Sequence, residues 1–145
     1  MRRAEIVAEA RGWLRTPFRP KGRSRAGLDC LGLLVLVADA FAVPHHDEQH
    51  YTDWPDPQRR MLAVFDRYMA RLPPGEPCWD GTVAVMSTYR TLPGHVGFFS
   101  TKHGVRHLIH ASMAVRRVCE EEFCTDVRRG GMRLVARYGF PGLED

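Results

Sequence analysis

The chain lacks the sequence features that mark several classes of protein. Among its 145 residues, no apolar run reaches the ~20 residues that a helix needs to cross a bilayer, because Asp39 interrupts the segment 31–43. The basic N-terminus has no apolar core like that of a signal peptide, and the sequence holds no internal repeat or low-complexity tract. We therefore expect one domain over residues 1–145, made in the cytoplasm without a signal peptide and without a membrane span.

Cysteine is scarce, and its spacing does not match the common metal modules. The four cysteines, Cys30, Cys78, Cys119 and Cys124, form no CxxC pair. Without a secretion signal we expect them to be reduced, and a local disulfide between Cys119 and Cys124 is the less favoured alternative. The histidines and acids at 45–50 are too densely spaced along a polar loop for a standard zinc site. We expect no metal and no cofactor.

Acidic residues are fewer than basic ones, and the formal net charge is +4. Much of the basic excess lies at 15–25, in the loop before Cys30. The ordinary interpretation is a solvated surface, and the functional alternative is a rim beside a cleft that attracts carboxylates. The basic residues are not interleaved with aromatic ones and no nucleic-acid module is visible, so we expect no nucleic-acid partner.

What the chain does have is a cysteine at the start of an apolar helix. The segment 27–32, Gly-Leu-Asp-Cys-Leu-Gly, opens the apolar run and follows a loop rich in Gly and Arg. Unpaired N–H groups and the positive end of the helix dipole favour a thiolate at such a position. Cys30 is therefore a candidate nucleophile, although an ordinary core cysteine would fit the same run equally well.

Two downstream histidines favour the catalytic interpretation of Cys30. His95 stands at the entrance of a short apolar strand, and His110 lies near the end of a strand with alternating polarity. A thiol nucleophile needs a base within hydrogen-bond reach, and the base needs a third group that fixes its tautomer. A single histidine in a strand is more often structural. Three suitable groups in this order are typical of a nucleophile, a base and an orienting residue.

Five segments carry a resemblance to a known family. They are 10–18 (Ala-Arg-Gly-Trp-Leu-Arg-Thr-Pro-Phe), 29–33 (Asp-Cys-Leu-Gly-Leu), 80–85 (Asp-Gly-Thr-Val-Ala-Val), 95–97 (His-Val-Gly) and 109–112 (Ile-His-Ala-Ser). In this order and at these spacings the chain resembles the NlpC-type cell-wall cysteine peptidases, which have a compact papain-like fold. The resemblance implies that Cys30 is the nucleophile, that His95 is the base and that His110 orients His95.

The finer resemblance is to the branch encoded with phage tails and gene transfer agents. It rests on Cys-Leu-Gly at 30–32, on the short chain and on the closing Tyr-Gly-Phe-Pro at 138–141. It implies a tail-associated peptidase that cleaves peptidoglycan stem peptides between D-glutamate and a diamino acid, so that the particle passes the cell wall. Its partners would be tail-tip or baseplate proteins, and it would act in the periplasm and cell wall.

One position departs from the family pattern. The family often has a tyrosine after Thr-Pro, near the catalytic centre, where this chain has Phe18. Loss of an oxyanion donor costs ~100-fold or more in rate, although the backbone N–H of Cys30 stays available. We predict that Phe18, Arg25 and Asp29 contact the substrate. The alternative function is a non-enzymatic tail-tip or baseplate subunit that keeps the peptidase fold.

Hydrophobic periodicity predicts an α+β domain in which N-terminal helices pack on an antiparallel sheet of about five strands. The expected helices are 3–14, 30–41 and 56–72, with a short one near 120–129. The expected strands are 82–87, 95–100, 105–111, 114–118 and 132–138.

Overall fold

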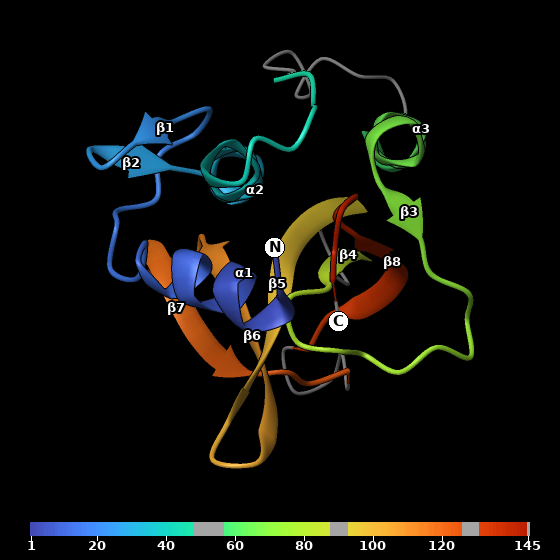
Figure 1. The fold of residues 1–145 in the computed structure, drawn as a ribbon. Helices are drawn as coiled ribbons and strands as arrows, with labels where there is room; N and C mark the ends of the chain where they lie inside the picture. The colour runs from blue at the N-terminus through green and yellow to red at the C-terminus, as the bar shows by residue number, and fades with distance from the viewer. Residues whose placement is uncertain (48–56, 88–92, 126–130, 145) are drawn as a thin grey trace.

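A computed structural model describes residues 1–47, 57–87, 93–125 and 131–144 (Figure 1). Its helices are α1 (Arg3–Arg11), α2 (Cys30–Ala40) and α3 (Pro57–Tyr68). Its strands are β1 (Arg23–Ser24), β2 (Gly27–Leu28), β3 (Ala70–Arg71), β4 (Val83–Ser87), β5 (Pro93–Lys102), β6 (Val105–Ser112), β7 (Arg117–Glu122) and β8 (Arg133–Gly139). In the part of the chain that is described, no helix is long and apolar enough to span a membrane.

The main sheet is antiparallel, with its strands in the order β3-β8-β4-β5-β6-β7, and β1 and β2 pair with each other as a separate hairpin. The helix α2 packs against β5 and β6, while α1 and α3 also contact β5. In Figure 1, α1 lies in front of the strands β5 to β7 and α3 lies above β3. The predicted α+β class and the helix-on-sheet packing are confirmed, with six strands in the main sheet rather than about five.

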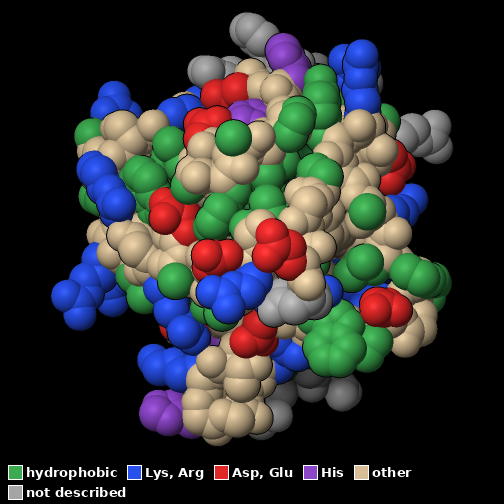
Figure 2. Space-filling view, in the orientation of Figure 1, with side chains coloured by type: hydrophobic (Ala, Val, Ile, Leu, Met, Phe, Trp, Pro, Cys, Tyr) green, Lys and Arg blue, Asp and Glu red, His purple; other side chains and the backbone are tan. Residues whose placement is uncertain are grey.

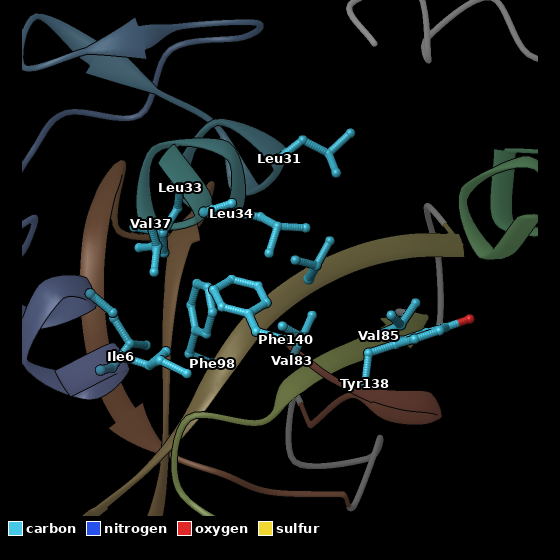
Figure 3. Close-up of a cluster of buried hydrophobic side chains, with 14 of the residues drawn as sticks. Ile6, Leu31, Leu33, Leu34, Val37, Val83, Val85, Phe98, Tyr138 and Phe140 are labelled. Carbon is cyan, nitrogen blue, oxygen red and sulfur yellow. The ribbon is translucent and has the colours of Figure 1, made fainter. Parts of the chain in front are cut away.

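Strand alternation divides the buried side chains between the two faces of the sheet. Val83, Val85 and Phe98 belong to the main cluster, which also takes in the buried side chains of α1 and α2 (Figure 3). Their neighbours on the opposite face, including Met86 and Phe99, form a smaller cluster. Because α2 is covered by the sheet and by α1, an apolar sequence over most of its surface is what burial requires.

The N-terminal half differs from the sequence-based expectation mainly at the ends of helices. The helix α1 ends at Arg11 rather than near residue 14, and α3 ends at Tyr68 rather than near residue 72. The chain after α3 leaves the helix because Ala70 and Arg71 pair with the end of β8. The predicted loop before Cys30 contains the short β1–β2 hairpin.

The largest error concerns the segment 114–125. We predicted a strand at 114–118 followed by a helix near 120–129, but the strand β7 runs over Arg117–Glu122. It pairs with β6 along its whole length, from Ser112↔Arg117 to His107↔Glu122. A run of three glutamates has little strand propensity of its own, so pairing with β6 determines the conformation here. Residues 126–129 lie outside the described part of the chain.

Candidate active site

The nucleophile candidate stands where the sequence placed it, as the first residue of α2. Asp29 is the N-cap, and its buried carboxylate accepts hydrogen bonds from the backbone N–H of Gly32 at 2.9 Å and of Lys21 at 2.7 Å. The guanidinium of Arg23 lies 3.0 Å from the same carboxylate. Asp29 therefore fixes both the start of the helix and the loop before it. Its predicted contact with substrate stays a prediction.

Gly32 lets that loop lie directly on α2. A Cβ atom at this position would come within 2.3 Å of the carbonyl oxygen of Gly22 and 3.0 Å of the Leu28 side chain. No side chain fits at that separation, so the Asp-Cys-Leu-Gly sequence has a packing reason for its glycine. The loop in turn shapes the surroundings of Cys30.

The thiol of Cys30 reaches the main chain on both sides of His95. Its Sγ lies 4.0 Å from the carbonyl oxygen of Gly94, and the backbone N–H of Val96 also contacts the sulfur. Because Gly94 and Val96 flank His95 in β5, the nucleophile and the proposed base share one small region. The structure thus brings together the two residues that the sequence paired.

Burial changes the expected ionisation of Cys30. Desolvation, and then the charge of Asp29, raise the pKa of the thiol to about 12. The N–H groups of Val96 and Leu31 and the charge of Arg23 act in the opposite direction, but they do not outweigh it. Cys30 is therefore a thiol at rest. The expectation that the helix dipole makes it a thiolate is not met, because burial has the larger effect on its pKa. A base is needed to remove its proton.

His95 and His110 are in direct contact. The Nε2 atom of His95 lies 2.6 Å from Nδ1 of His110, with the two rings edge to face. Burial, and then the neighbouring His110, lower the pKa of His95 to about 3, so its imidazole is neutral at neutral pH. A neutral imidazole is the form that accepts a proton from a thiol.

Glu121 extends this pair into a relay of three side chains. Its Oε1 lies 2.6 Å from Nε2 of His110, and that hydrogen bond is the main reason that the pKa of Glu121 is lowered. A carboxylate can only accept, so Nε2 of His110 donates and its Nδ1 accepts from Nε2–H of His95. His95 then carries its lone pair on Nδ1, the atom left to act as a base.

Two site residues were not predicted from the sequence, Glu121 and Cys119, and Sγ of Cys119 lies 3.6 Å from Nε2 of His110. Burial and the charge of Glu121 raise the pKa of the Cys119 thiol to about 11. Both residues lie on the face of β7 that carries them next to His110, which pairs directly with Cys119. Reading 117–122 as an alternating strand beside 105–112 would have found them.

The strands β5 and β6 separate where the site lies. Their pairing runs from Lys102↔Val105 to Phe98↔Ile109, and the described residues of β5 before Phe98 pair with β4. Gly97 stands at the point of separation, where a Cβ atom would lie 2.8 Å from the carbonyl oxygen of Ile109 and 3.0 Å from the Cβ of His110. Because Gly97 has no side chain, His110 can pack closely against β5.

A mainly apolar hollow of about 50 Å³ lies between α2 and α3. Leu31, the residue after Cys30, lines it together with Met61 of α3. Met61 also comes within 3.1 Å of the position that a Cβ of Gly94 would occupy, so this side chain lies between the hollow and the start of β5. Hydrophobic side chains gather between α2 and α3 on the face shown in Figure 2. A substrate at Cys30 would meet an apolar wall on this side.

The other two predicted substrate contacts are held by local structure. Phe18 pairs with Leu28, donates its N–H to the carbonyl oxygen of Arg116 at 2.9 Å and packs its half-buried ring against the core. The guanidinium of Arg25 lies 3.6 Å from the centre of the Trp13 ring and donates to the carbonyl oxygen of Gly12 at 2.6 Å. Contact of either residue with substrate stays a prediction.

The polar loop at 45–50 is tied to the body of the protein in its described part. His45 lies 3.1 Å from the carboxylate of Asp39, and Asp47 forms an ion pair with Arg23 at 3.0 Å. Residues 48–50 lie outside the described part.

The fold matches those of solved structures, among which 22 chains are similar to this one. The NlpC/p60 domain of the peptidoglycan hydrolase SagA matches with a TM-score of 0.63 and 18% identity, over 97% of this chain and 100% of that one. An NlpC/P60 family protein from Bacillus cereus matches with a TM-score of 0.67 and 14% identity, over 97% of this chain and 40% of that one. An N-acetylmuramoyl-L-alanine amidase from Bacteroides uniformis matches with a TM-score of 0.60 and 11% identity, over 94% and 97%.

These identities are low, and no family model and no curated protein matches the sequence. The likeness therefore concerns the fold, which extends over nearly the whole chain. The protein has the papain-like NlpC/P60 fold of cell-wall hydrolases.

Proposed function

We propose that the protein is a cysteine peptidase that hydrolyses peptidoglycan stem peptides. The observation that carries the proposal is the position of Cys30 against the main chain flanking His95. Nε2 of His95 contacts His110, and His110 in turn is hydrogen-bonded to Glu121. This arrangement supplies a nucleophile, a base and an orienting pair. The NlpC/P60 fold, shared with the peptidoglycan hydrolase SagA, supports a cell-wall substrate.

The first half of the reaction forms a thioester. Nδ1 of His95 takes the proton of Cys30, and Sγ attacks an amide carbonyl of the stem peptide. The backbone N–H of Cys30, at the first position of α2, has no acceptor within the helix and can donate to the oxyanion. The imidazolium of His95, held through His110 by the charge of Glu121, then gives its proton to the leaving amine as the C–N bond breaks.

The second half regenerates the thiol. His95 removes a proton from water, the resulting hydroxide attacks the thioester carbonyl, and the C–S bond breaks. The carboxylic acid product leaves, and the proton held by His95 returns to the sulfur of Cys30. No group beyond these side chains and water is required for this cycle.

We propose that the protein has its biological role in the tail of a phage-like particle. The sequence resemblance to the branch encoded with phage tails and gene transfer agents supports a component of the tail tip or baseplate that opens the cell wall for the particle. The same resemblance supports cleavage between D-glutamate and a diamino acid. The mainly apolar hollow that Leu31 lines supports contact with an apolar part of the substrate on that side.

A structural tail subunit is the second candidate. Phe18 favours it, because the ring packs against the core and provides no hydroxyl for an oxyanion. The two functions are compatible, since a peptidase fixed in a tail tip is also one of its subunits.

The test is cleavage of synthetic stem peptides, with products identified by mass spectrometry. The wild type and Cys78→Ala should cleave, while Cys30→Ala should not. Cys78 is the matched control because it packs in the smaller cluster, away from the core that contacts Cys30. Equal cleavage by Cys30→Ala would contradict the proposal, and inactivity of the folded wild type would favour the structural subunit.

A further inference from the structure

Three different metal-binding atoms meet on the strands β6 and β7. His110 pairs with Cys119, and Glu121 follows on the same face of β7. The ring nitrogen of His110, the sulfur of Cys119 and a carboxylate oxygen of Glu121 all lie within 4.8 Å of one another. Imidazole, thiolate and carboxylate are the three side-chain ligands that proteins use for Zn²⁺.

The two better-fixed atoms already have the separation of tetrahedral ligands. Sγ of Cys119 lies 3.6 Å from Nε2 of His110. Bond lengths of ~2.3 Å for Zn–S and ~2.1 Å for Zn–N, at a tetrahedral angle, place two such atoms ~3.6 Å apart. His110 is only 4% exposed and is held from its other nitrogen by His95, so this half of the site is preformed.

The third ligand needs a small movement that the structure permits. Oε1 of Glu121 is 2.6 Å from Nε2 of His110, and a tetrahedral ion would require ~3.4 Å between them. The side chain of Glu121 is 51% exposed, so it can turn outward without displacing a packed group. A water molecule from the solvent side would complete the coordination.

We propose that His110, Cys119 and Glu121 form a binding site for one Zn²⁺ ion, and that the bound ion inhibits the peptidase by reversing the hydrogen bonds of the His95–His110 relay. The binding site stands on the geometry of these three residues alone. The inhibitory effect rests on the proposed function.

The inhibition follows from the tautomers. In the metal-free protein, Nε2–H of His110 donates to Glu121 and its Nδ1 accepts from His95, which leaves the lone pair of His95 on Nδ1. A metal on Nε2 of His110 is bound by the lone pair of that nitrogen, so neutral His110 must carry its proton on Nδ1. It then donates to Nε2 of His95, and the proton of His95 must sit on Nδ1, the atom that would accept from Cys30.

The protons balance in this change. His110 and His95 each hold one N–H proton before and after the metal binds, but both protons move from Nε2 to Nδ1. Cys119 releases its thiol proton to the solvent as the Zn–S bond forms. The ion thus leaves the nucleophile in place and removes the acceptor that activates it.

Metal binding is tested first without reference to activity. Co²⁺ replaces Zn²⁺ as a spectroscopic probe, and the protein is Cys30→Ala, so the catalytic thiol cannot bind the metal. We expect a thiolate-to-Co²⁺ charge-transfer band that Zn²⁺ removes. The band should vanish when Cys119→Ser is added and persist when Cys124→Ser is added, with circular dichroism confirming that each variant is folded. Absence of the band in Cys30→Ala, or its persistence with Cys119→Ser, would overturn the site.

Inhibition is tested by titrating stem-peptide cleavage with Zn²⁺, with each variant compared to its own metal-free rate. Even an outer-shell partner is worth ~10–100-fold in metal affinity, so Cys119→Ser should need at least about tenfold more Zn²⁺ than the wild type. Cys124→Ser should match the wild type. Equal sensitivity of Cys119→Ser and the wild type would overturn the inhibitory role. An inactive metal-free wild type would contradict the proposed function instead, and the Co²⁺ band would still decide whether the site exists.

Discussion

The Nε2 atom of His95 lies 2.6 Å from Nδ1 of His110, and this contact determines which nitrogen of His95 serves as the base. His110 contacts His95, Glu121 and Cys119. It acts on the reaction through the tautomer and the orientation of its neighbour, and it passes on the charge of Glu121.

Replacing His110 should therefore lower kcat with little change in KM. We expect a loss of about 100-fold for His110→Ala, which is the low end of what a working general base contributes. His110→Asn should lose less, because its Oδ1 can accept from Nε2–H of His95. Steady-state kinetics on a stem peptide checks this. A KM effect with unchanged kcat, or no rescue by Asn relative to Ala, would count against the positioning role.

The negative charge of Glu121 should contribute to kcat beyond its role as a hydrogen-bond acceptor for His110. Glu121→Gln keeps an acceptor for His110 but loses the negative charge, and a charge-assisted hydrogen bond is about twice as strong as a neutral one. We expect kcat to fall about tenfold, since ~1.4 kcal/mol corresponds to that factor. Glu122→Gln is the matched control, because the neighbouring residue points to the other face of β7. Equal rates for the two variants would remove Glu121 from the relay.

Alkylation of Cys30 should report a thiol and not a preformed thiolate. Its pKa is raised to about 12 by burial, and His95 is neutral with a pKa of about 3, so the thiolate fraction is small at neutral pH. The rate of reaction with iodoacetamide should rise about tenfold per pH unit and still be rising near pH 9, where an ordinary cysteine levels off. Labelling of Cys30 is followed by mass spectrometry of its peptide. A plateau reached below neutral pH would show a thiolate–imidazolium pair instead.

Much of this site could be predicted from the chain. Cys30 was identified because a helix start and an apolar run are local patterns, and His95 and His110 because strands show a two-residue period. Glu121 and Cys119 were not predicted, because finding them requires 117–122 to be a strand in the register His110↔Cys119, and the three glutamates do not favour a strand. The protonation of Cys30 could not be predicted either. It depends on how completely the fold buries the sulfur, and burial outweighs the helix dipole here.

Even the smallest side chain at position 97 should destabilise the protein. A methyl group there would meet the carbonyl oxygen of Ile109 at 2.8 Å and Cβ of His110 at 3.0 Å, so β6 must shift and carry the relay with it. Overpacking of this kind costs ~1–3 kcal/mol. We expect Gly97→Ala to lose about that much stability in urea denaturation, and activity as well. Gly139→Ala is the control, because a Cβ at that position meets no atom within 4 Å. Similar behaviour of the two variants would contradict the close packing.

The N-cap of α2 gives a prediction about stability. Asp29→Ala removes the acceptor for Gly32 and Lys21 and leaves the guanidinium of Arg23 without that carboxylate. Loss of an N-cap alone costs ~0.5–2 kcal/mol. Asp29→Asn should cost less than Asp29→Ala, because the amide oxygen can still cap the helix. Chemical denaturation checks the order, and equal losses would show that the ion pair with Arg23 outweighs the cap.

The covalent intermediate is the most direct test of the account. A stem peptide is mixed with the protein, the reaction is stopped in acid within the first turnovers, and the intact protein is weighed by mass spectrometry. We predict an added mass equal to the acyl part of the peptide, located on Cys30 and missing from both Cys30→Ala and Cys30→Ser. Cleavage of the peptide that proceeds at full rate in Cys30→Ala would contradict it, because the thiol would then take no part in the reaction.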